Sequence, residues 1–544
     1  RSTAATRVNA DGNIEKETQN LLLQSNSFDT TWGTSNTSIA SGQSGYDGSS
    51  DAWLLTSTTG GGAIGQSISS SGVQTFSVYA KVGTLNWMAM TISGLSPSQA
   101  YFDLANGALG SSGSEIITSN IESVGGGWYR CSVLVNGAVS GVNIYPANAN
   151  NQVGILGSIN IQDAQLNQGL IAQEVITTTT TALYGGITDN VPRLDYTDSS
   201  CPALLLEPQR TNVLPSSEYW GTWNTGTNNS YESNVTTSPE GLQNASRLYS
   251  TGGNGINNHR VVSSLSVGST YTFSTYLKKH TRNDVEIYIY STAIGNFISR
   301  ASINFDAGTI SDLNGSGSTI EDAGNGWYRC TIKVVCDGSL SFGIYTFSGD
   351  TSVYAYGAQA EAGSYATSYI PTYGTSVTRN GEGSSKSGVS ELIGQTEGTI
   401  YAEFFMPNDY TGNETHRISL SDGSLNNWVF MSIPEVGDET RMYLRIGAST
   451  KIDAQTPNSP FTHNQVNKIA YGYKSGDLRI YINGVSVLSS STIYGSFTLP
   501  LSRINITGGS GSSGSNQNMS NNVKQTMLFK TRLSNEELAT LTTI

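Results

Sequence analysis

Two copies of one sequence unit occupy most of this chain, and this repeat limits the possible folds more than any other feature. Short segments recur in the same order, and the spacings between them differ by only a few residues. Residues 127–131 (GWYRC) match residues 326–330, and residues 76–81 (FSVYAK) match residues 273–278 (FSTYLK). Several such matches in register predict two homologous domains.

The remaining segments complete the predicted domain map. Prolines mark the stretch between the copies, and a stretch rich in Gly and Ser precedes a C-terminal unit that does not share the repeat. The map is an N-terminal arm (1–19), a first repeat domain (20–177), a linker (178–211), a second repeat domain (212–372), a Gly/Ser linker (373–393) and a third domain (394–544).

Composition and alternation predict an all-β fold. Charged residues are 13 % of the chain, against about 25 % in an ordinary soluble domain, and Gly (61 residues) is abundant. Such a mixture favours short strands joined by tight turns. Within residues 128–135, alternation places Tyr129, Cys131 and Val133 on one face, which we predict to be the core face. Cys131 and Cys330 are then small buried residues in different domains, not bonded to each other. The fold class that follows is a tandem of β-sandwich or jelly-roll domains.

The third domain carries its own local signals. Residues 468–474 and 477–487 predict a hairpin around Ser475-Gly476, and Asn483-Gly484 is a second turn signal. Ser534 and Glu537 have the spacing of a capping box, which predicts one short helix at the end of the sequence.

The charge balance disfavours several partners. The formal net charge is −13 and the isoelectric point is near 4.8, so we expect no nucleic acid bound through a broad basic face. No apolar run approaches the roughly 18 residues needed to span a bilayer, and we predict no membrane partner. Residues 1–12 are polar and do not have the pattern of a signal peptide. The four His are scattered, so no metal and no cofactor are predicted.

The best candidate binding residues are aromatic and cationic side chains on the non-core faces of strands. Aromatic rings can lie against the C–H faces of sugars, while charged groups bond the hydroxyls. The alternative is that these faces pack against a loop or another subunit, with Arg over an aromatic ring as a cation–π pair. The predicted carbohydrate-binding residues are Tyr79, Lys81, Trp128, Arg130, Tyr276, Lys278, Trp327, Arg329, Trp428, Arg479 and Tyr481.

No catalytic constellation stands out. Asp103 and Asp306 occupy equivalent positions before Gly-containing turns, and we predict that they cap those turns, with calcium or sugar contact as the alternative. Residues 509–514 match GxGxxG formally but lie in a Gly/Ser loop without a following helix, which argues against a dinucleotide site.

Several motifs resemble those of bacteriophage virion proteins. Residues 5–12 (ATRVNADG), 206–212 (LEPQRTN) and the two GWYRC strands are similar to segments of tail and head fibre proteins that contain carbohydrate-binding-module-like jelly rolls. Residues 398–403 (GTIYAE) and 536–541 (EELATL) resemble a laminin-G or concanavalin-A-like sandwich. The resemblance implies tandem jelly rolls followed by a concanavalin-A-like β-sandwich.

The expected function is therefore that of a non-enzymatic virion structural protein, a head or tail fibre or decoration component. Its expected partners are host surface polysaccharide, other virion proteins and further copies of itself, with a trimer as one arrangement. One alternative is a polysaccharide-degrading enzyme with binding modules, for which Glu403 and Asp422 are the acids to test. Another is a bacterial surface adhesin.

Overall fold

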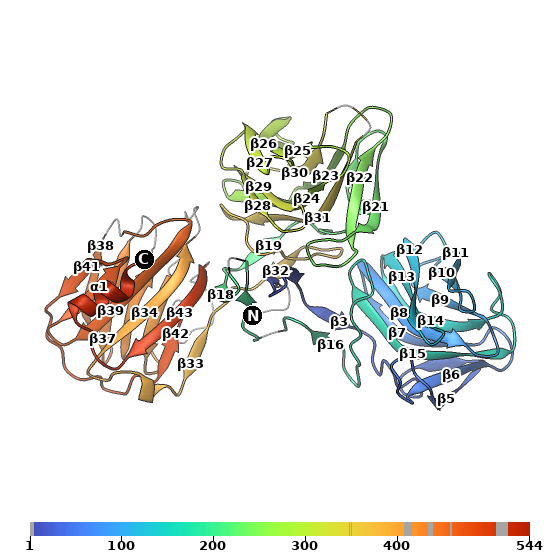
Figure 1. The fold of residues 1–544 in the computed structure, drawn as a ribbon, viewed down its shortest axis with the longest axis horizontal. Coiled ribbons are helices and arrows are strands. Elements are labelled where there is room, and N and C mark those ends of the chain that lie inside the picture. Colours follow the sequence, from blue (N-terminus) through green and yellow to red (C-terminus); the bar gives the residue numbers. More distant parts are fainter. Residues whose placement is uncertain are drawn as a thin grey trace.

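The described part of the protein forms three two-sheet β-sandwiches (Figure 1). The computed structural model describes residues 5–188, 190–197, 199–347, 349, 351–406, 416–433, 439–456, 460–506 and 521–544. Within these residues α1 (Asn535–Thr542) is the one α-helix. The predicted all-β fold with tandem β-sandwiches is confirmed.

The first sandwich contains two six-stranded antiparallel sheets. Sheet 1A contains, in spatial order, β11 (Ala108–Ser112), β10 (Gln99–Asp103), β9 (Trp87–Ser93), β14 (Val139–Ala147), β7 (Ala63–Ser70) and β4 (Gly33–Ser35). Sheet 1B contains β12 (Thr118–Gly125), β13 (Trp128–Asn136), β8 (Val73–Val82), β15 (Gly157–Gln168), β6 (Ala52–Ser57) and β5 (Thr37–Gln43).

The second sandwich repeats this order strand for strand. Sheet 2A contains β27 (Thr309–Asn314), β26 (Asn296–Asn304), β25 (Asp284–Ser291), β30 (Leu340–Tyr345), β23 (Asn257–Val262) and β20 (Asn224–Thr225). Sheet 2B contains β28 (Thr319–Asp322), β29 (Trp327–Val335), β24 (Thr270–Lys279), β31 (Thr351–Ala362), β22 (Ala245–Ser250) and β21 (Asn229–Thr236). The sequence repeat is thus a repeat of topology.

The third sandwich has a different order and borrows strands from the connecting segments. Sheet 3A contains β17 (Leu194–Asp195), β18 (Ala203–Leu206), β43 (Asn521–Phe529), β34 (Glu397–Met406), β39 (Gln465–Lys474), β40 (Leu478–Ile482) and β41 (Val485–Ser490). Sheet 3B contains β33 (Ser385–Ser387), β42 (Arg503–Asn505), β35 (His416–Ser421), β36 (Trp428–Ile433), β37 (Thr440–Ile446) and β38 (Ser449–Thr456). Strands β17, β18 and β33 lie in segments that the sequence predicts as linkers.

The local signals of the third sandwich are confirmed. Strands β39 and β40 form the predicted hairpin, and Asn483 and Gly484 both have positive φ in the turn that leads to β41. At the start of α1, Ser534 accepts from the backbone N–H of Glu537, whose carboxylate accepts from the backbone N–H of Ser534 at 2.7 Å.

The connecting segments meet between the sandwiches, where short strand pairs hold them together (Figure 1). The pairs are β1 (Arg7–Val8) with β2 (Ile14–Glu15), β3 (Thr18–Asn20) with β16 (Leu183–Gly185), and β19 (Arg210–Asn212) with β32 (Val377–Arg379). We call this region the junction.

A buried ion cluster fastens the junction. The side chains of Arg193 and Arg379 are fully buried, and each contacts Glu207 Oε2 at 2.7 Å. Arg193 also pairs with Glu382 and donates to the carbonyl oxygen of Thr6 at 2.6 Å. Burial alone would raise the pKa of Glu207, but the two guanidinium groups and hydrogen bonds from Ser368 outweigh it and lower this pKa to about 2.

A second buried cluster joins the N-terminal arm to the second sandwich. Lys16 Nζ lies 3.0 Å from Glu218 Oε1 and 2.6 Å from Glu240 Oε1. Burial opposes the charge of Lys16, but the two carboxylates outweigh it and raise the pKa of Lys16 well above its usual value. Burial also raises the pKa of Glu218. The arm is therefore held by charges that have little contact with water.

Each sandwich buries its own core between its two sheets. The predicted core face of β13 is confirmed, because Cys131, Val133 and Val135 all lie in the first core. Cys330 lies in the core of the second sandwich, and both cysteines are free thiols.

Candidate functional site

The predicted aromatic and cationic residues of the first copy lie on the outward face of sheet 1B, but that face is covered. Trp128 is only 2 % exposed and Tyr79 8 %. The ring of Tyr46, from the loop before β6, stacks on Tyr79 with ring centroids 3.8 Å apart. The guanidinium carbon of Arg130 lies 5.4 Å from the centroid of the Tyr79 ring, and Arg130 donates a hydrogen bond to the carbonyl oxygen of Gln173 at 2.5 Å. Lys81, in the same strand as Tyr79, is half-buried.

The second copy repeats this arrangement. Trp327 and Tyr276 are buried in a cluster that includes Ile14 of the N-terminal arm. Arg329 lies 5.4 Å from the Tyr276 ring and donates to the carbonyl oxygen of Thr367 at 2.6 Å. Lys278 Nζ lies 6.0 Å from the Trp327 ring.

Most of the aromatic surface of these residues on sheets 1B and 2B is therefore covered, and carbohydrate binding by them stays a prediction. The alternative interpretation, loop packing with Arg over an aromatic ring, describes both copies. Alternation along a strand shows which side chains point away from the core. It does not show which distant segment lies over them.

Of the third-domain residues, Trp428 is separated from Arg479 and Tyr481. Trp428 lies on β36 in sheet 3B, whereas Arg479 and Tyr481 lie on β40 in sheet 3A. Tyr481 is covered by the C-terminal helix, since it packs with Leu538. Arg479 is half-exposed and lies 3.5 Å from Asp477. Arg479 and Tyr481 alternate with core residues of β40 and share a non-core face, as predicted. Trp428 does not join them, because the sequence does not show which sheet each strand joins.

The two equivalent aspartates differ. Asp103 caps its turn as predicted: its Oδ1 accepts from the backbone N–H groups of Ala105 and Asn106 at 3.0 and 3.2 Å. In the second copy Asn304 caps the turn instead, and Asp306 pairs with Lys279 at 2.7 Å. The turn-capping prediction is therefore wrong for Asp306.

The acids proposed for a catalytic alternative lie apart. Glu403 is on β34 in sheet 3A, and Tyr401 donates to it at 3.3 Å. Asp422 follows β35 of sheet 3B and accepts hydrogen bonds from Ser424 and Asn427, which lower its pKa against the effect of burial. The GxGxxG segment at 509–514 lies outside the described residues.

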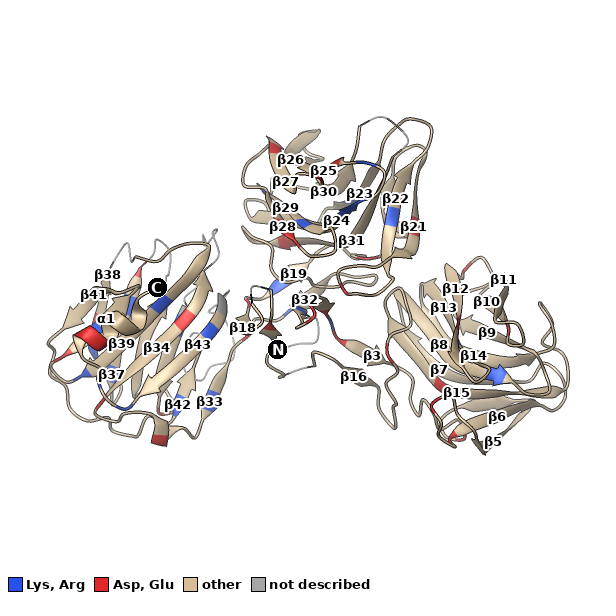
Figure 2. Ribbon diagram, viewed as in Figure 1, with Lys and Arg blue, Asp and Glu red and all other residues tan. Residues whose placement is uncertain are grey.

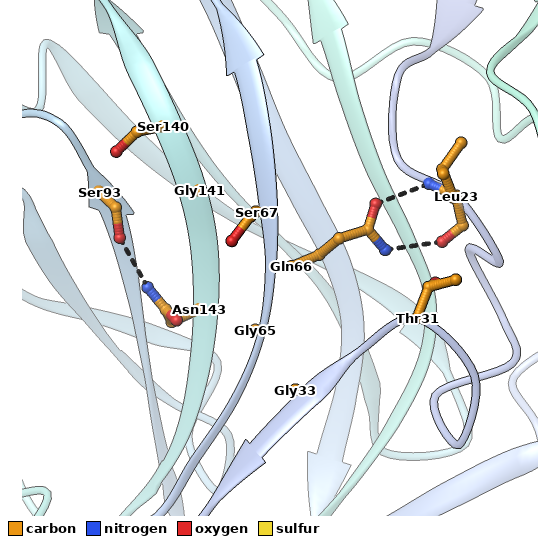
Figure 3. Close-up of a pocket in the computed structure, with 10 residues that line it drawn as sticks. All are labelled: Leu23, Thr31, Gly33, Gly65, Gln66, Ser67, Ser93, Ser140, Gly141 and Asn143. Atoms are coloured by element: carbon orange, nitrogen blue, oxygen red, sulfur yellow. Dashed lines mark hydrogen bonds between the residues drawn. The ribbon is translucent and has the colours of Figure 1, made fainter.

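The outward face of sheet 1A, in contrast, carries an open groove (Figure 3). Its volume is about 630 Å³. The groove runs over β4, β7, β14 and β9, and alternate residues of β7, β14 and β9 fill the first core. Its lining residues are small or polar, and none is charged: Leu23, Thr31, Gly33, Gly65, Gln66, Ser67, Ser93, Ser140, Gly141 and Asn143.

Hydrogen bonds fix the polar side chains at both sides of this groove (Figure 3). Gln66 accepts from the backbone N–H of Leu23 and donates to its carbonyl oxygen, both at 2.8 Å. Asn143 donates to Ser93 Oγ at 3.1 Å and Thr91 Oγ1 at 3.3 Å. The floor needs glycine beside Asn143, because a Cβ at Gly65 would lie 2.1 Å from Asn143 Oδ1.

An aromatic cluster adjoins the groove on the same sheet. Tyr101 is buried against Ala89 and Ala147, and Trp87 and Tyr145 pack on it while half-exposed. Rings at the edge of a polar groove offer apolar surface beside hydrogen-bonding groups.

Sequence reasoning missed this face although the signal is present. In β7 and β14, Gly65, Ser67 and Asn143 alternate with the core residues Ile64, Val142 and Ile144. Small polar residues on an outward face leave room for a ligand, but they attract less attention than Trp and Arg.

A second, larger cleft lies beside the junction. Its volume is about 1210 Å³, and the arm, sheet 2B and the connecting segments all contribute to it. Its lining residues include the predicted residues Tyr276 and Arg329 and the acids Glu207, Glu321 and Asp322. Glu207 has a lowered pKa, whereas a general acid in glycoside hydrolysis needs a raised one.

The described residues contain no group of three or more His, Cys, Asp or Glu side chains suited to a metal ion. In that same part of the chain, no helix has the length and apolar character needed to cross a membrane.

Comparison with known proteins gives distant fold likenesses only. No protein-family model matches the sequence, and no curated protein matches it. Among solved structures, the carbohydrate-binding module CBM40 of a Ruminococcus gnavus sialidase, bound to α2,3-sialyllactose, is 14 % identical over 30 % of this chain and 93 % of its own, with a TM-score of 0.25.

Two further likenesses are of the same kind. The tandem CBM22 modules of Paenibacillus barcinonensis Xyn10C are 10 % identical over 67 % of this chain and 99 % of theirs, with a TM-score of 0.21. Galectin-Ib of Xenopus laevis is 10 % identical over 27 % of this chain and 99 % of its own, with a TM-score of 0.20. These neighbours are carbohydrate-binding modules and lectins, but at such scores the likeness transfers no site to this chain.

Proposed function

We propose that this chain is a glycan-binding protein and that the groove on sheet 1A holds a neutral sugar chain. The observation that carries the proposal is the groove itself. It is uncharged, it presents amide and hydroxyl groups at fixed positions, and it adjoins the aromatic cluster of Trp87, Tyr101 and Tyr145. A volume of about 630 Å³ lies in the range of about 300–1,000 Å³ typical of ligand sites.

The chemistry suits a carbohydrate. Amide and hydroxyl groups exchange hydrogen bonds with sugar hydroxyls without the desolvation cost of a buried charge. Half-exposed rings such as Trp87 supply apolar surface for the C–H faces of a sugar. Each such site is weak, and display of several copies raises avidity without any new contact.

The test is binding of a panel of immobilised neutral oligosaccharides to the full chain and two variants. Ser67→Trp places a large ring on the exposed rim of the groove and should abolish binding. Val261→Trp makes the same change at the matching position of sheet 2A and serves as the control. Equal binding by wild type and Ser67→Trp, both folded by circular dichroism, would remove the groove from the proposal.

We further propose, from the sequence resemblance, that the chain is a fibre or decoration component of a bacteriophage particle. On this proposal it attaches the particle to host surface polysaccharide, contacts other virion proteins and assembles with further copies of itself. The third sandwich is then a laminin-G or concanavalin-A-like module. Mass spectrometry of purified particles tests the location, and analytical ultracentrifugation tests the assembly.

The proposed role is non-catalytic. Glu403 and Asp422 belong to different sheets and already have hydrogen-bond partners, which is not the arrangement of two carboxylates across one substrate. Cleavage of a polysaccharide by the purified chain, lost on Glu403→Gln, would replace this proposal with the enzymatic alternative.

A further inference from the structure

The outward face of sheet 3B concentrates arginine in a chain whose formal net charge is −13. Strands β35, β36 and β37 turn Ile418, Val429 and Met442 toward the third core, so their alternate residues point outward. Figure 2 also shows basic residues on the neighbouring strands β33 and β42. The arginines in the outward phase are Arg417, Arg441, Arg445 and Arg503, and the acids on or beside the same face are Asp453 and Glu439.

Aromatic rings support two of these arginines, Arg417 and Arg441. Trp428, Phe430 and Tyr443 form one cluster, with the Phe430 and Tyr443 rings stacked at 4.7 Å. The guanidinium carbon of Arg417 lies 4.7 Å from the Phe430 ring, and that of Arg441 lies 5.5 Å from the Tyr443 ring. A guanidinium near a ring face gains cation–π stabilisation and still has N–H groups that can bond an anion.

Two of the arginines are not neutralised by described carboxylates. Arg441 is held by Asp453 through two contacts of 2.7 Å. Arg445, by contrast, donates to the carbonyl oxygen of Ala448 at 3.0 Å, and Arg503 donates to Ser385 Oγ at 2.8 Å. Among the described residues neither has a carboxylate partner, so both charges are available to a ligand.

These two arginines lie in one row across the sheet. Strand pairing places Arg503 beside Ser421, Ser421 beside Trp428, and Trp428 beside Arg445. Three strand spacings separate the two Cα atoms, about 14 Å in all. The row therefore offers a positive charge at each end, and the buried ring of Trp428 lies between them.

We propose that the outward face of sheet 3B binds a glycan that carries anionic groups, carboxylate, phosphate or sulfate. Arg445 and Arg503 bind anions on separate sugar units, and guanidinium–anion pairs of this kind are among the stronger hydrogen bonds in proteins. The inference rests on the proposed glycan-binding function but names a different site and a different ligand class from the neutral groove of sheet 1A.

The experiment measures binding of the full chain to four immobilised polymers: polygalacturonate, poly(glycerol phosphate), dextran sulfate and unmodified dextran. Wild type should bind at least one anionic polymer more tightly than dextran, and rising salt should weaken that binding. The anionic polymer preferred identifies the group recognised. The double variant Arg445→Gln/Arg503→Gln should bind it at least about ten-fold more weakly.

Matched variants separate this site from others. Lys474→Gln removes a basic residue from the opposite sheet of the same sandwich and should leave binding unchanged. Ser67→Trp should weaken the binding of neutral oligosaccharides alone. An error in the proposed groove and an error in the proposed anionic site therefore give different results. Thermal unfolding of each variant shows whether it is folded.

Three results would overturn the proposal. They are equal binding of dextran and the anionic polymers by wild type, unchanged affinity in a folded Arg445→Gln/Arg503→Gln variant, and binding of a 20-base-pair DNA duplex as tight as that of the preferred polymer. The last would show a surface for polyanions in general and not for a saccharide.

Discussion

The two repeats share one topology but differ on the outward face of their A sheets. In the first copy, Asn143 pairs with Thr91, and the short side chains leave a groove. At the matching pair of the second copy, Gly343 lies opposite Tyr288, whose ring covers it: a Cβ on Gly343 would lie 2.5 Å from Tyr288 Cζ. One strand order can thus carry an open groove or a filled aromatic surface, and a few outward residues decide which.

The filled face of the second copy is rich in contacts of its own. Arg300 lies 5.3 Å from the Phe297 ring and 5.4 Å from the Phe347 ring, and it pairs with Glu286 at 2.7 Å. Phe347 is 49 % exposed, so this face still offers an aromatic surface to solvent. The two copies therefore keep one strand order and differ in the residues on the outward faces of their A sheets.

The segments that cover the B sheets also differ between the two copies. Substitution of Lys16 should give the largest loss of stability among the variants proposed here. The arm covers sheet 2B through Lys16, whereas the neutral stack of Tyr46 on Tyr79 covers sheet 1B. Lys16→Met leaves two buried carboxylates unpaired and should lower the unfolding free energy of the second sandwich by about 3–5 kcal/mol. Calorimetry, with hydrogen exchange to assign each transition, measures this.

Tyr46→Leu, which removes the matching cover in the first copy, is the control for Lys16→Met. It should lower the unfolding free energy of the first sandwich by about 1–2 kcal/mol, because it removes the ring stack on Tyr79 and the hydrogen bond to Asp163 but breaks no ion pair. A larger effect from Tyr46→Leu than from Lys16→Met would contradict the distinction between charged and neutral covering.

Part of the fold could be predicted from the sequence, whereas most of the candidate site could not. The fold class, the repeat, the core face of β13 and the cap of α1 all depend on local alternation or short-range spacing, which the sequence contains directly. The covering of Tyr79 and Trp327 depends on segments far along the chain. The assignment of Trp428 and Tyr481 to different sheets depends on strand order, which no local pattern encodes.

Removal of the Tyr288 ring tests whether this side chain alone fills the outward face of sheet 2A. Tyr288→Thr removes the ring above Gly343 and should produce a groove like that of sheet 1A. We expect a loss of about 2–3 kcal/mol in the unfolding free energy of the second sandwich, because Tyr288 is only 4 % exposed. The variant should also gain weak binding to the neutral oligosaccharides that bind the first copy, measured by surface plasmon resonance.

The converse change fills the groove of sheet 1A with a tyrosine ring. Thr91→Tyr/Asn143→Gly gives sheet 1A the residue pair of sheet 2A, and the ring should fill the groove. Affinity for neutral oligosaccharides should fall at least about ten-fold, close to 1.4 kcal/mol. Binding of the anionic polymers by sheet 3B should not change, and retained neutral binding would show that the groove is not the site.

The smallest expected effect concerns Asp163, which occupies a left-handed position (φ +48°) where the second copy has Gly357 (φ +60°). Burial, with smaller contributions from Asp51 and Asp47, raises the pKa of Asp163 to about 6 against the hydrogen bond from Tyr46. Because the folded-state pKa exceeds the unfolded value, ionisation costs stability as pH rises from about 4 through 6.

Asp163→Asn removes that cost but weakens the bond from Tyr46, so we expect a gain of about 1 kcal/mol at pH 8. At pH 4 the gain should disappear, and urea unfolding at the two pH values measures it. A variant that is less stable than wild type at pH 8 would show that the charge of Asp163 is needed.

The strands that the connecting segments donate have a mechanical consequence. Strand β18 pairs with β43, and β33 pairs with β42, so the third sandwich is tied to the junction through both of its sheets. A pull on the third sandwich therefore loads two sets of interstrand hydrogen bonds in parallel, and beyond them the ion cluster around Arg193. Such a joint should transmit tension and torque between the sandwiches at forces that would straighten a single flexible tether.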